Sequence, residues 1–565
     1  MLIRLASVAS RKLAHLLELW HERGFSAVQD NLRDQLLGAG PDPARTPAEF
    51  LKRFEPTPEL LARFRRKKWP ADAPIFTLSL APDPTATETD RDACSRSIRE
   101  QTYPHWELLD ATEGTGTFAA RLNPKVRLAP HALHRFAEAI LASDADILFA
   151  DGAVAGTDPD DILGIAARPA FSYDHYLTHP DLGDPVFVRT ARLREVGGWE
   201  SGDDPILRLL EVGATVAHIP DVLSRSAPAV PPDVEAGRSA RERHFARLGL
   251  AAEVVPDRWN PGFYDVRFPV DPAARVAIVI PTKNRVDLLR PCLESLERTT
   301  DPRTVEITVL DHGSDDPATL AYFREIAARH RIVPVTGPFN FAALMNQGIA
   351  AIRGEATHYL FLNNDTLAPE PGWLDRMLGL ACRPDVGAVG ATLIFPDGTI
   401  QHAGITTGAL GGADHVYRNR PLHRNGYERS RADGGMHLAS RDVAAVTAAC
   451  LLIRAELFHR LNGFDERFAV EFNDVDLCLR VRAAGYKVIQ DGRAVLFHFE
   501  GRSRGTERIH WDDIDRFVET HRALLDAGDP FASPLHSMRP DVNALQPFPV
   551  PPAEVRPRTV RVKVG

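Results

Sequence analysis

The sequence predicts an α/β protein built from βαβ units, preceded by a helical segment. Three observations lead to this prediction. From residue 75 onward, short apolar runs alternate with helical patterns, which is the rhythm of βαβ units. In the second half, successive strand-like runs end in polar residues at their carboxyl side. Two long stretches of the chain also resemble each other, which indicates a duplicated domain rather than a solenoid.

The size and composition describe a globular, multidomain chain. Its 565 residues exceed one ordinary core, and 44% hydrophobic with 25% charged residues is a globular mixture. A formal charge of -9 argues against a general nucleic-acid-binding protein. The five cysteines lie far apart with no CxxC pair, so we expect a reducing compartment and no cysteine zinc site.

The opening stretch "MLIRLASVASRKLAHLLELW" is amphipathic at helical spacing. Basic residues interrupt it, and no run in the chain approaches 18 apolar residues, so we expect neither a spanning helix nor a secretory signal. The sequence therefore predicts a cytoplasmic location. We favour docking of this helix onto the protein's own core, and its cationic side leaves open a peripheral contact with an anionic inner-membrane surface.

Changes in pattern place the domain boundaries. A charged, proline-bearing stretch, "RFRRKKWPADAP", ends the helical opening, and "SAPAVPPDVEAG" interrupts the first βαβ series. The predicted units are a helical segment at 1–74, a first α/β module at 75–238, a linker at 239–271, a second α/β domain at 272–515, and a C-terminal helix and tail at 516–565.

In the second domain the buried strands are "RVAIVIP", "VEITVLD", "IVPVTG" and "THYLFLNND", and "RVDLLRPCLESLERT" is an amphipathic helix between the first two. Polar residues follow three of these strands. Because the carboxyl ends of parallel strands meet at one edge of a sheet, we expect these residues to line a single crevice.

Asp365 follows the apolar run "YLFL" and is flanked by Asn363, Asn364 and Thr366. Such oxygen ligands suit Mg²⁺ or Mn²⁺. An Asp that forms an Asx turn before the next helix is the alternative explanation.

The segment "FNDVDLCLRVRAAGY" places Asn473 as the cap of a helix that ends at Gly485, with Asp474 and Asp476 in its first turn. This structural role would explain both carboxylates. The functional alternative makes one of them a general base within hydrogen-bond reach of an acceptor hydroxyl. Spacing alone does not decide between the two.

The segment "FHFEGRSRG" follows an apolar run with His498 and then Arg502 and Arg504 among glycines. A flexible cationic loop of this kind suits a diphosphate, and a solvated charge run is the alternative. The P-loop, dinucleotide, zincin and hydrolase motifs are all missing from the sequence.

Taken together, "VAIVIPTKNRVDLLRPCLESL", "VEITVLDHGSDD", "PFNFAALMNQGIA", "YLFLNNDT", "DGTIQHAGI", "AVTAACLLIR", "FNDVDLCLR" and "HFEGRSRG" resemble the bacterial family 2 glycosyltransferases of cell-surface polysaccharide assembly, of the O-antigen and rhamnan type. The resemblance covers roughly residues 265 to 535. It implies a GT-A fold, here in tandem copies, and an inverting transfer from a nucleotide-sugar with Mg²⁺ or Mn²⁺.

The resemblance also implies roles for individual residues. The nucleotide-sugar would be bound by Pro281, Thr282, Asn284, Arg285, Asp311, Asn346, Asn363, Asn364 and Arg504. The metal would be held by Asp365, with His498 in the C-terminal element that faces the diphosphate. The general base would be Asp474, with Glu471 in reserve.

The first module resembles a degenerate copy of the same domain. The interval from Asp110 to Val126, which aligns with Asp365, is far shorter than that from Asp311 to Asp365, and we expect the metal strand to be missing. Gly202 aligns with Asp474. We therefore expect packing, acceptor positioning or partner binding from this module.

The expected function is transfer of a hexosyl or deoxyhexosyl group from a nucleotide-sugar donor to a lipid-linked or polysaccharide acceptor, with no nucleic-acid partner. A non-catalytic scaffold in a polysaccharide-assembly complex is one alternative. A sugar nucleotidyltransferase is another, although "IPTKNRVDLL" lacks the glycine-rich basic loop that such an enzyme needs.

Overall fold

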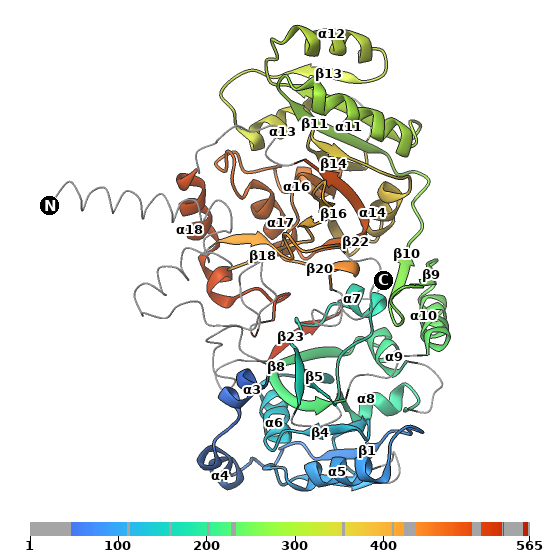
Figure 1. Ribbon diagram of the computed structural model, residues 1–565, viewed down its shortest axis with the longest axis vertical. Helices are drawn as coiled ribbons and strands as arrows, with labels where there is room; N and C mark the ends of the chain where they lie inside the picture. The colour runs from blue at the N-terminus through green and yellow to red at the C-terminus, as the bar shows by residue number, and fades with distance from the viewer. Residues whose placement is uncertain are drawn as a thin grey trace, which may run out of the picture.

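Two mixed β-sheets, one in each α/β unit, organise the computed structural model (Figure 1). The structure describes residues 47–109, 114–156, 161–199, 204–227, 233–352, 356–408, 412–422, 436–499, 510–533, 535 and 557–562. The first unit occupies the lower half of Figure 1 and the second unit the upper half. The predicted α/β class is therefore confirmed, and the amphipathic stretch at residues 1–20 lies outside the described residues.

The first sheet has nine strands in the order β2-β1-β3-β7-β5-β8-β23, with β4 on β8 and β6 on β5. Its strands are β1 (Phe76–Leu80), β2 (Trp106–Leu109), β3 (Phe118–Leu122), β4 (Val126–Leu128), β5 (Ile147–Ala155), β6 (Ile162–Ala166), β7 (Phe187–Arg189), β8 (Thr215–Ser226) and β23 (Arg558–Arg561). Its helices include α5 (Glu88–Arg99), α6 (Ala132–Ala142), α7 (Tyr173–Thr178), α8 (Thr190–Glu195) and α9 (Pro205–Glu211).

The second sheet has ten strands in the order β13-β12-β11-β14-β21-β16-β22-β15, with β17 on β16 and β20 on β22. Its strands are β11 (Val276–Thr282), β12 (Val305–Asp311), β13 (Arg331–Pro334), β14 (His358–Leu362), β15 (Thr366–Leu367), β16 (Val386–Ile394), β17 (Ile400–His402), β20 (Arg441–Asp442), β21 (Cys450–Arg454) and β22 (Lys487–His498). Its helices include α11 (Val286–Thr299), α12 (Pro317–Ile326), α13 (Phe341–Ala351), α14 (Trp373–Ala381), α16 (Ala455–Arg460) and α17 (Asn473–Ala483).

The two sheets correspond strand for strand. The path β12-β11-β14-β21-β16-β22-β15 matches β2-β1-β3-β7-β5-β8-β4, with the same parallel and antiparallel pairings. In the second sheet α12, β13 and α13 come between β12 and β14, an interval for which the first unit has only residues 110–117. The expectation that the first unit lacks the metal strand is therefore wrong, because β3 occupies the place of β14. A common origin of the two units stays a prediction.

Helix α11 shows why the sequence forms these elements. Its apolar positions recur at helical spacing, and all of them are buried against the sheet, as predicted: Leu288, Leu289, Cys292, Leu293 and Leu296. Helix α17 differs from the prediction at its start. Its N-cap is Phe472, in the left-handed region at φ 60°, and Asn473 is the first helical residue. The helix ends before Gly485, whose φ is 87°, as predicted.

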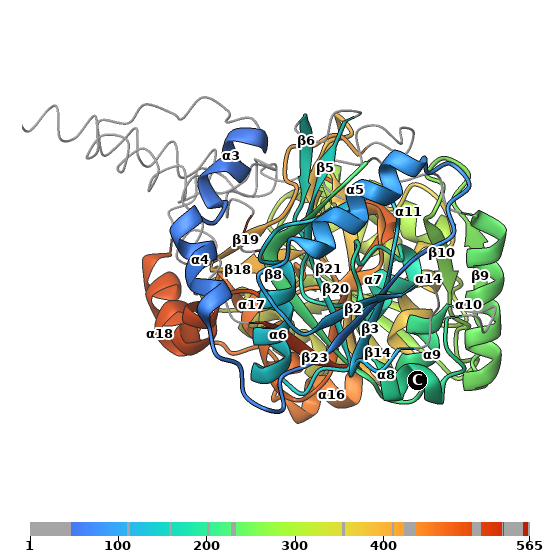
Figure 2. The ribbon, with the colours of Figure 1, turned by 90° about the horizontal axis from the view of Figure 1, so that it is seen from below.

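The segment predicted as a linker is structured. Helix α10 (Val234–Leu248) spans the boundary placed at 238/239, and β9 (Glu253–Pro256) pairs with β10 (Tyr264–Arg267) in a hairpin. Figures 1 and 2 show this hairpin on the opposite side of the molecule from α3 (Pro47–Phe54) and α4 (Pro58–Arg66). Strand β23, which follows α18 (Trp511–Ala527) in the chain, returns to the first unit. It pairs with β8 and adds a strand to the first sheet.

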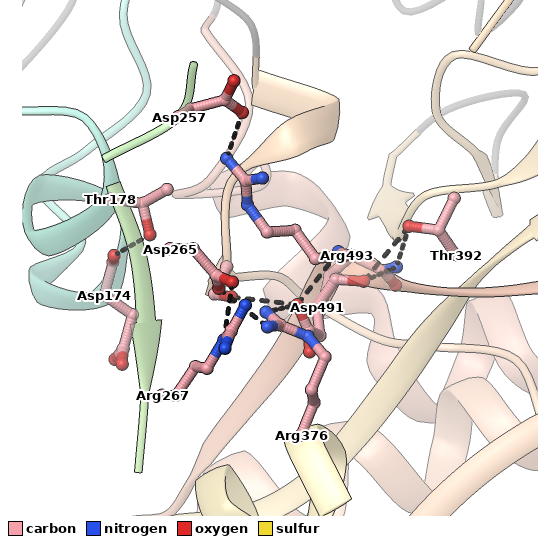
Figure 3. A network of polar contacts seen from close by, with 11 residues as sticks. Asp174, Thr178, Asp257, Asp265, Arg267, Arg376, Thr392, Asp491 and Arg493 are labelled. Carbon is pink, nitrogen blue, oxygen red and sulfur yellow. Dashed lines mark hydrogen bonds and ion pairs between the residues drawn. The ribbon is translucent and has the colours of Figure 1, made fainter. Parts of the chain in front are cut away.

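Buried charges tie the hairpin to the second unit (Figure 3). Arg376 Nη1 donates to Asp265 Oδ1 at 2.7 Å, and its Nη2 donates to Asp491 Oδ1 at 3.3 Å. Arg493 Nη2 donates to Asp257 Oδ2 at 2.6 Å. Removing one partner would leave an uncompensated buried charge, so these pairs hold the two units in one arrangement.

A second set of charges joins α7 of the first unit to the second sheet. Arg383 and Lys487 both pair with Asp174, the latter at 3.2 Å. Burial alone would raise the pKa of Asp174, and the two neighbouring cations hold it below its usual value instead. Ser172 Oγ donates to Asp442 Oδ2 at 2.7 Å in the same contact.

Within the described part of the chain, no helix is both long and apolar enough to span a bilayer. All five cysteines are free thiols. Burial raises the pKa of the Cys292 thiol to about 12, so it stays protonated and unreactive near neutral pH.

We expect acid to destabilise the chain as the pH falls from about 6.5 to 4. Burial lowers the pKa of His358, the first residue of β14, to about 4. In the unfolded chain His358 takes up a proton near pH 6.5, whereas in the folded chain it does so only near pH 4. The free energy of unfolding therefore decreases as the pH falls between these values, by roughly 3 kcal/mol in all. Urea unfolding at several pH values should show a shallower loss for His358→Gln, and an identical slope would contradict this origin.

Candidate active site

The candidate site lies at the carboxyl ends of β11, β12 and β14. Thr282 and Asp311 are partners in the parallel register of β11 and β12, at the last position of both strands. Asn364, which follows β14, donates from Nδ2 to Thr282 Oγ1 at 2.9 Å. The structure therefore brings together the polar residues that the sequence placed at three separate strand ends.

The loop after β11 is held in an unusual backbone conformation. Asn284 and Arg285 both have positive φ, at 56° and 58°. The Asn284 side chain accepts from the amides of Asp315 and Asp316, both at 2.9 Å, and donates to Asp315 Oδ1 at 2.9 Å. Asn284 therefore shapes the crevice by joining the loops after β11 and β12.

The other two polar residues of this end of the crevice are Asp311 and Arg285. Asp311 Oδ1 accepts from the Ser314 amide at 2.8 Å, and its side chain is only half-buried. The Arg285 guanidinium pairs with Asp287 at 2.8 Å. Pro281 lies in β11 opposite Leu310 and contributes backbone rather than a polar group.

Asp365 and His498 form a buried pair at the mouth of the second sheet. Asp365 Oδ1 lies 3.2 Å from His498 Nε2, and the two side chains are 2% and 5% exposed. The pairing of β15 with β22 sets Thr366 opposite His498, which fixes this contact. Helix α14 begins at Trp373 with Gly372 as its N-cap, so Asp365 does not cap it.

This pair fits a divalent cation that is completed by substrate oxygens. Among the described residues no group of three or more His, Cys, Asp or Glu side chains is arranged to hold a metal ion. Asp365 and His498 would offer a carboxylate oxygen and an imidazole nitrogen, and Mg²⁺ or Mn²⁺ commonly takes its remaining ligands from phosphates and water. Asn363 Nδ2 also lies 3.3 Å from His498 Nε2. Arg504 lies outside the described residues.

Asp474 stands at the second position of α17. Its Oδ1 accepts from the Val475 amide at 2.8 Å, as a first-turn carboxylate would. Its Oδ2 reaches out of the helix to the Ala448 amide at 2.9 Å. Burial raises the pKa of this carboxyl group above its usual value, which makes it a better proton acceptor. A first-turn structural role therefore accounts for only one of its oxygens, and α17 has no side-chain cap.

Other predicted residues have structural partners. Asn346 is engaged by the loop after α16: it donates from Nδ2 to Phe464 O at 2.9 Å and accepts from the Phe464 amide at 2.9 Å. These contacts give Asn346 a structural role, and its part in nucleotide-sugar binding stays a prediction. Asp476 pairs with Arg480 at 2.8 Å. The Glu471 amide donates to Asp513 Oδ2 at 3.1 Å, which fixes its backbone beside Asp474.

Sequence reasoning missed His402, His415 and Thr447. His402 is fully buried, and its Nδ1 lies 3.0 Å from His415 Nδ1. The Thr447 amide donates to His402 Nε2 at 3.5 Å. The motif "DGTIQHAGI" carried a signal for His402, but its partner His415 follows from the fold alone.

The first unit has a lysine where the second has its buried carboxylate. Two pairs of equivalent contacts fix the alignment of the units. Cys94 Sγ lies 3.9 Å from Asn123 O in the first unit, as Cys292 Sγ lies 3.8 Å from Asn363 O in the second. The Leu128 amide donates to Ser97 Oγ, as the Ala368 amide donates to Ser295 Oγ, both at 3.1 Å. Lys125, not Val126, therefore occupies the place of Asp365. Its ammonium donates to Thr85 Oγ1 at 2.7 Å. Gly202 lies outside the described residues.

Residues 277–460 match the family model described as Glycosyl transferase family 2. The chain is similar to the O-antigen biosynthesis protein RfbC of Myxococcus xanthus, with 34% identity over 447 residues that cover 74% of this chain and 34% of that protein. It is also similar to an N-acetylglucosaminyl-diphospho-decaprenol L-rhamnosyltransferase of Mycobacterium tuberculosis, with 27% identity over 225 residues covering 38% of this chain and 73% of that protein.

Among solved structures, a mannosyltransferase of Pyrobaculum calidifontis in complex with GDP-Man and Mn²⁺ aligns at 19% identity with a TM-score of 0.31, covering 42% of this chain and 61% of that chain. The chain spans about a third of the length of the Myxococcus relative.

Proposed function

We propose that this chain, which carries a family 2 glycosyltransferase domain over residues 277–460, transfers a sugar with inversion from a nucleotide-diphosphate donor to a growing bacterial surface polysaccharide. The observation that supports the proposal is that two carboxylates lie in different surroundings. Asp365 is paired with an imidazole at the mouth of the sheet, whereas Asp474 is held by amides and has a raised pKa. Two such environments suit cation binding and proton transfer, respectively.

In this mechanism Asp474 accepts the proton of the acceptor hydroxyl as its oxygen attacks the anomeric carbon. The bond from that carbon to the diphosphate oxygen breaks, and the nucleoside diphosphate departs. Asp365 and His498 would hold the divalent cation, which neutralises charge on the leaving diphosphate when bound. Arg504 would also neutralise charge on the leaving diphosphate.

The donor nucleoside would lie at the opposite end of the crevice. The loops after β11 and β12 are joined through Asn284, which leaves Asp311 half-buried beside Thr282. We assign Thr282, Asn284, Arg285 and Asp311 to nucleoside binding, with Asn363 and Asn364 between them and the cation. This assignment follows the resemblance to family 2 enzymes.

The named relatives guide the choice of substrate class. One is an O-antigen biosynthesis protein and another a rhamnosyltransferase acting on a diphospho-decaprenol sugar. We infer a hexosyl or deoxyhexosyl donor and a lipid-linked or polysaccharide acceptor, used in the cytoplasm at the inner face of the membrane. We assign the first unit a non-catalytic role, because Lys125 replaces the carboxylate at its strand end.

A thermal-shift screen tests the donor half of this proposal. The full-length chain is heated with each nucleoside diphosphate and Mn²⁺ or Mg²⁺. A ligand at 100 times its dissociation constant should add roughly 2.7 kcal/mol of stability, and the nucleotide that works identifies the donor class. Metal alone and nucleotide with chelator are the controls. A chain that no nucleoside diphosphate stabilises with either metal would contradict the proposal.

A further inference from the structure

Two histidines on different strands meet near the segment whose amide binds the carboxylate assigned as the base. His402 ends β17, and His415 ends β19 (Ala413–His415). Their Nδ1 atoms are 3.0 Å apart, and the ring planes are nearly perpendicular, at 79°. Neither residue is used by the cation site or the nucleoside site described above.

The hydrogen bonds define the protonation of this pair. His402 Nε2 accepts the Thr447 amide proton, so in a neutral ring the proton lies on Nδ1. That Nδ1–H must then donate to His415 Nδ1, which is free of a proton. This arrangement satisfies both contacts with a single shared proton. Burial lowers the pKa of His402 well below its ordinary value, which favours the neutral ring.

The pair is connected to Asp474 through one turn of chain. His402 holds the amide of Thr447, and the next amide, of Ala448, donates to Asp474 Oδ2 at 2.9 Å. The same segment is held from the other side, where Ile405 N donates to Ala445 O at 2.9 Å. The segment is thus held by β17 and β18 (Ile405–Thr407) on one side, and on the other by α17, where Cys478 Sγ contacts Val446 O and Arg482 Nη1 donates to Val443 O.

We propose that His402 and His415 are positioning residues for the general base: their one-proton contact fixes residues 447 and 448, and thereby the orientation of the Asp474 carboxylate toward the acceptor hydroxyl. The inference rests on the proposed function of Asp474. Under this proposal His402, the histidine of "DGTIQHAGI", acts in the transfer step and not in donor binding.

The test compares two substitutions of His415 in the full-length chain. His415→Asn keeps an acceptor oxygen near the place of Nδ1, whereas His415→Ala removes the acceptor. We expect His415→Ala to lower kcat by about 10- to 100-fold, the usual range when a group that orients an active-site side chain is lost. His415→Asn should stay within a few-fold of the parent. Binding of the nucleoside diphosphate with Mn²⁺, measured by calorimetry, should be unchanged in both and also reports that they are folded.

A double-mutant cycle separates positioning from general damage. If His415 acts through Asp474, adding His415→Ala to Asp474→Asn should not lower kcat further, since the group being positioned no longer accepts a proton. A further loss equal to that of the single variant would overturn the inference. So would a His415→Ala enzyme with parental kcat. If Asp474→Asn itself turns over normally, the base assignment fails first, and this outcome is distinct from failure of the histidine pair alone.

Discussion

Asp474→Asn is expected to reduce the turnover of sugar transfer by about 10² to 10⁴ while leaving donor affinity nearly unchanged. Asparagine has the size of aspartate and can still accept the Ala448 amide that now binds Oδ2. It cannot take up a proton, and the raised pKa of Asp474 is the property that the substitution removes. Steady-state release of nucleoside diphosphate in the presence of acceptor measures turnover, and calorimetry measures donor affinity.

Asp476→Asn is the matched control, because it makes the same chemical change in the same turn of α17. Asp476 pairs with Arg480 and with His521, at 2.8 and 3.0 Å, and so has a structural role. This variant should lose stability but keep turnover within a few-fold when folded. Near-normal turnover of Asp474→Asn would instead transfer the role of base to Glu471 or leave Asp474 with helix capping alone.

Asp365→Ala is expected to abolish metal-dependent binding of the nucleoside diphosphate while leaving the fold intact. Asp365 lies at a strand end, so its substitution by alanine should change the packing of the core little. The substitution does remove the carboxylate that pairs with His498 and that we expect to bind the cation. Asp365→Asn, which keeps the size of the side chain beside His498, should behave in the same way. Calorimetric titration with Mn²⁺, repeated with chelator, measures the effect.

Asp397→Ala serves as the control for charge, since Asp397 lies on an exposed turn where it accepts from the Thr399 amide at 2.9 Å. It should bind the nucleotide like the parent. Equal binding by Asp365→Ala and parent, with and without chelator, would remove Asp365 from the site. Residual metal-dependent binding in Asp365→Ala would point to the first unit, where Lys125 leads us to expect none.

The two units are best tested together in the intact chain. A truncation near Pro261 would cut the hairpin of β9 and β10, whose Asp265 and Asp257 pair with Arg376 and Arg493. It would also separate β23 from its partner β8. Substitutions in the full-length chain therefore report on the site more cleanly than isolated halves do.

Local pattern was sufficient for much of the second unit. The spacing of Leu288, Leu289 and Leu296 predicted the buried face of α11, and the polar residues after the strands were correctly expected to lie close together. Periodicity of this kind depends on burial of one face of a helix or strand, which neighbouring residues specify by themselves. The same reasoning made Asp365 a candidate, because it follows an apolar strand, and placed Asp474 in the first turn of a helix, whereas its role as base was implied by the family resemblance.

Only the tertiary structure decided how distant residues meet. Strand β23 joins the first sheet by pairing with β8, although more than three hundred residues lie between them. Asn346 is occupied by Phe464, and His402 meets His415 across two strands. The contacts of Cys94 and Cys292 align Lys125, and not Val126, with Asp365, and the sequence alone did not reveal this register. Such pairings depend on register and on chain contacts between remote segments, and a local pattern of apolar and polar residues contains neither.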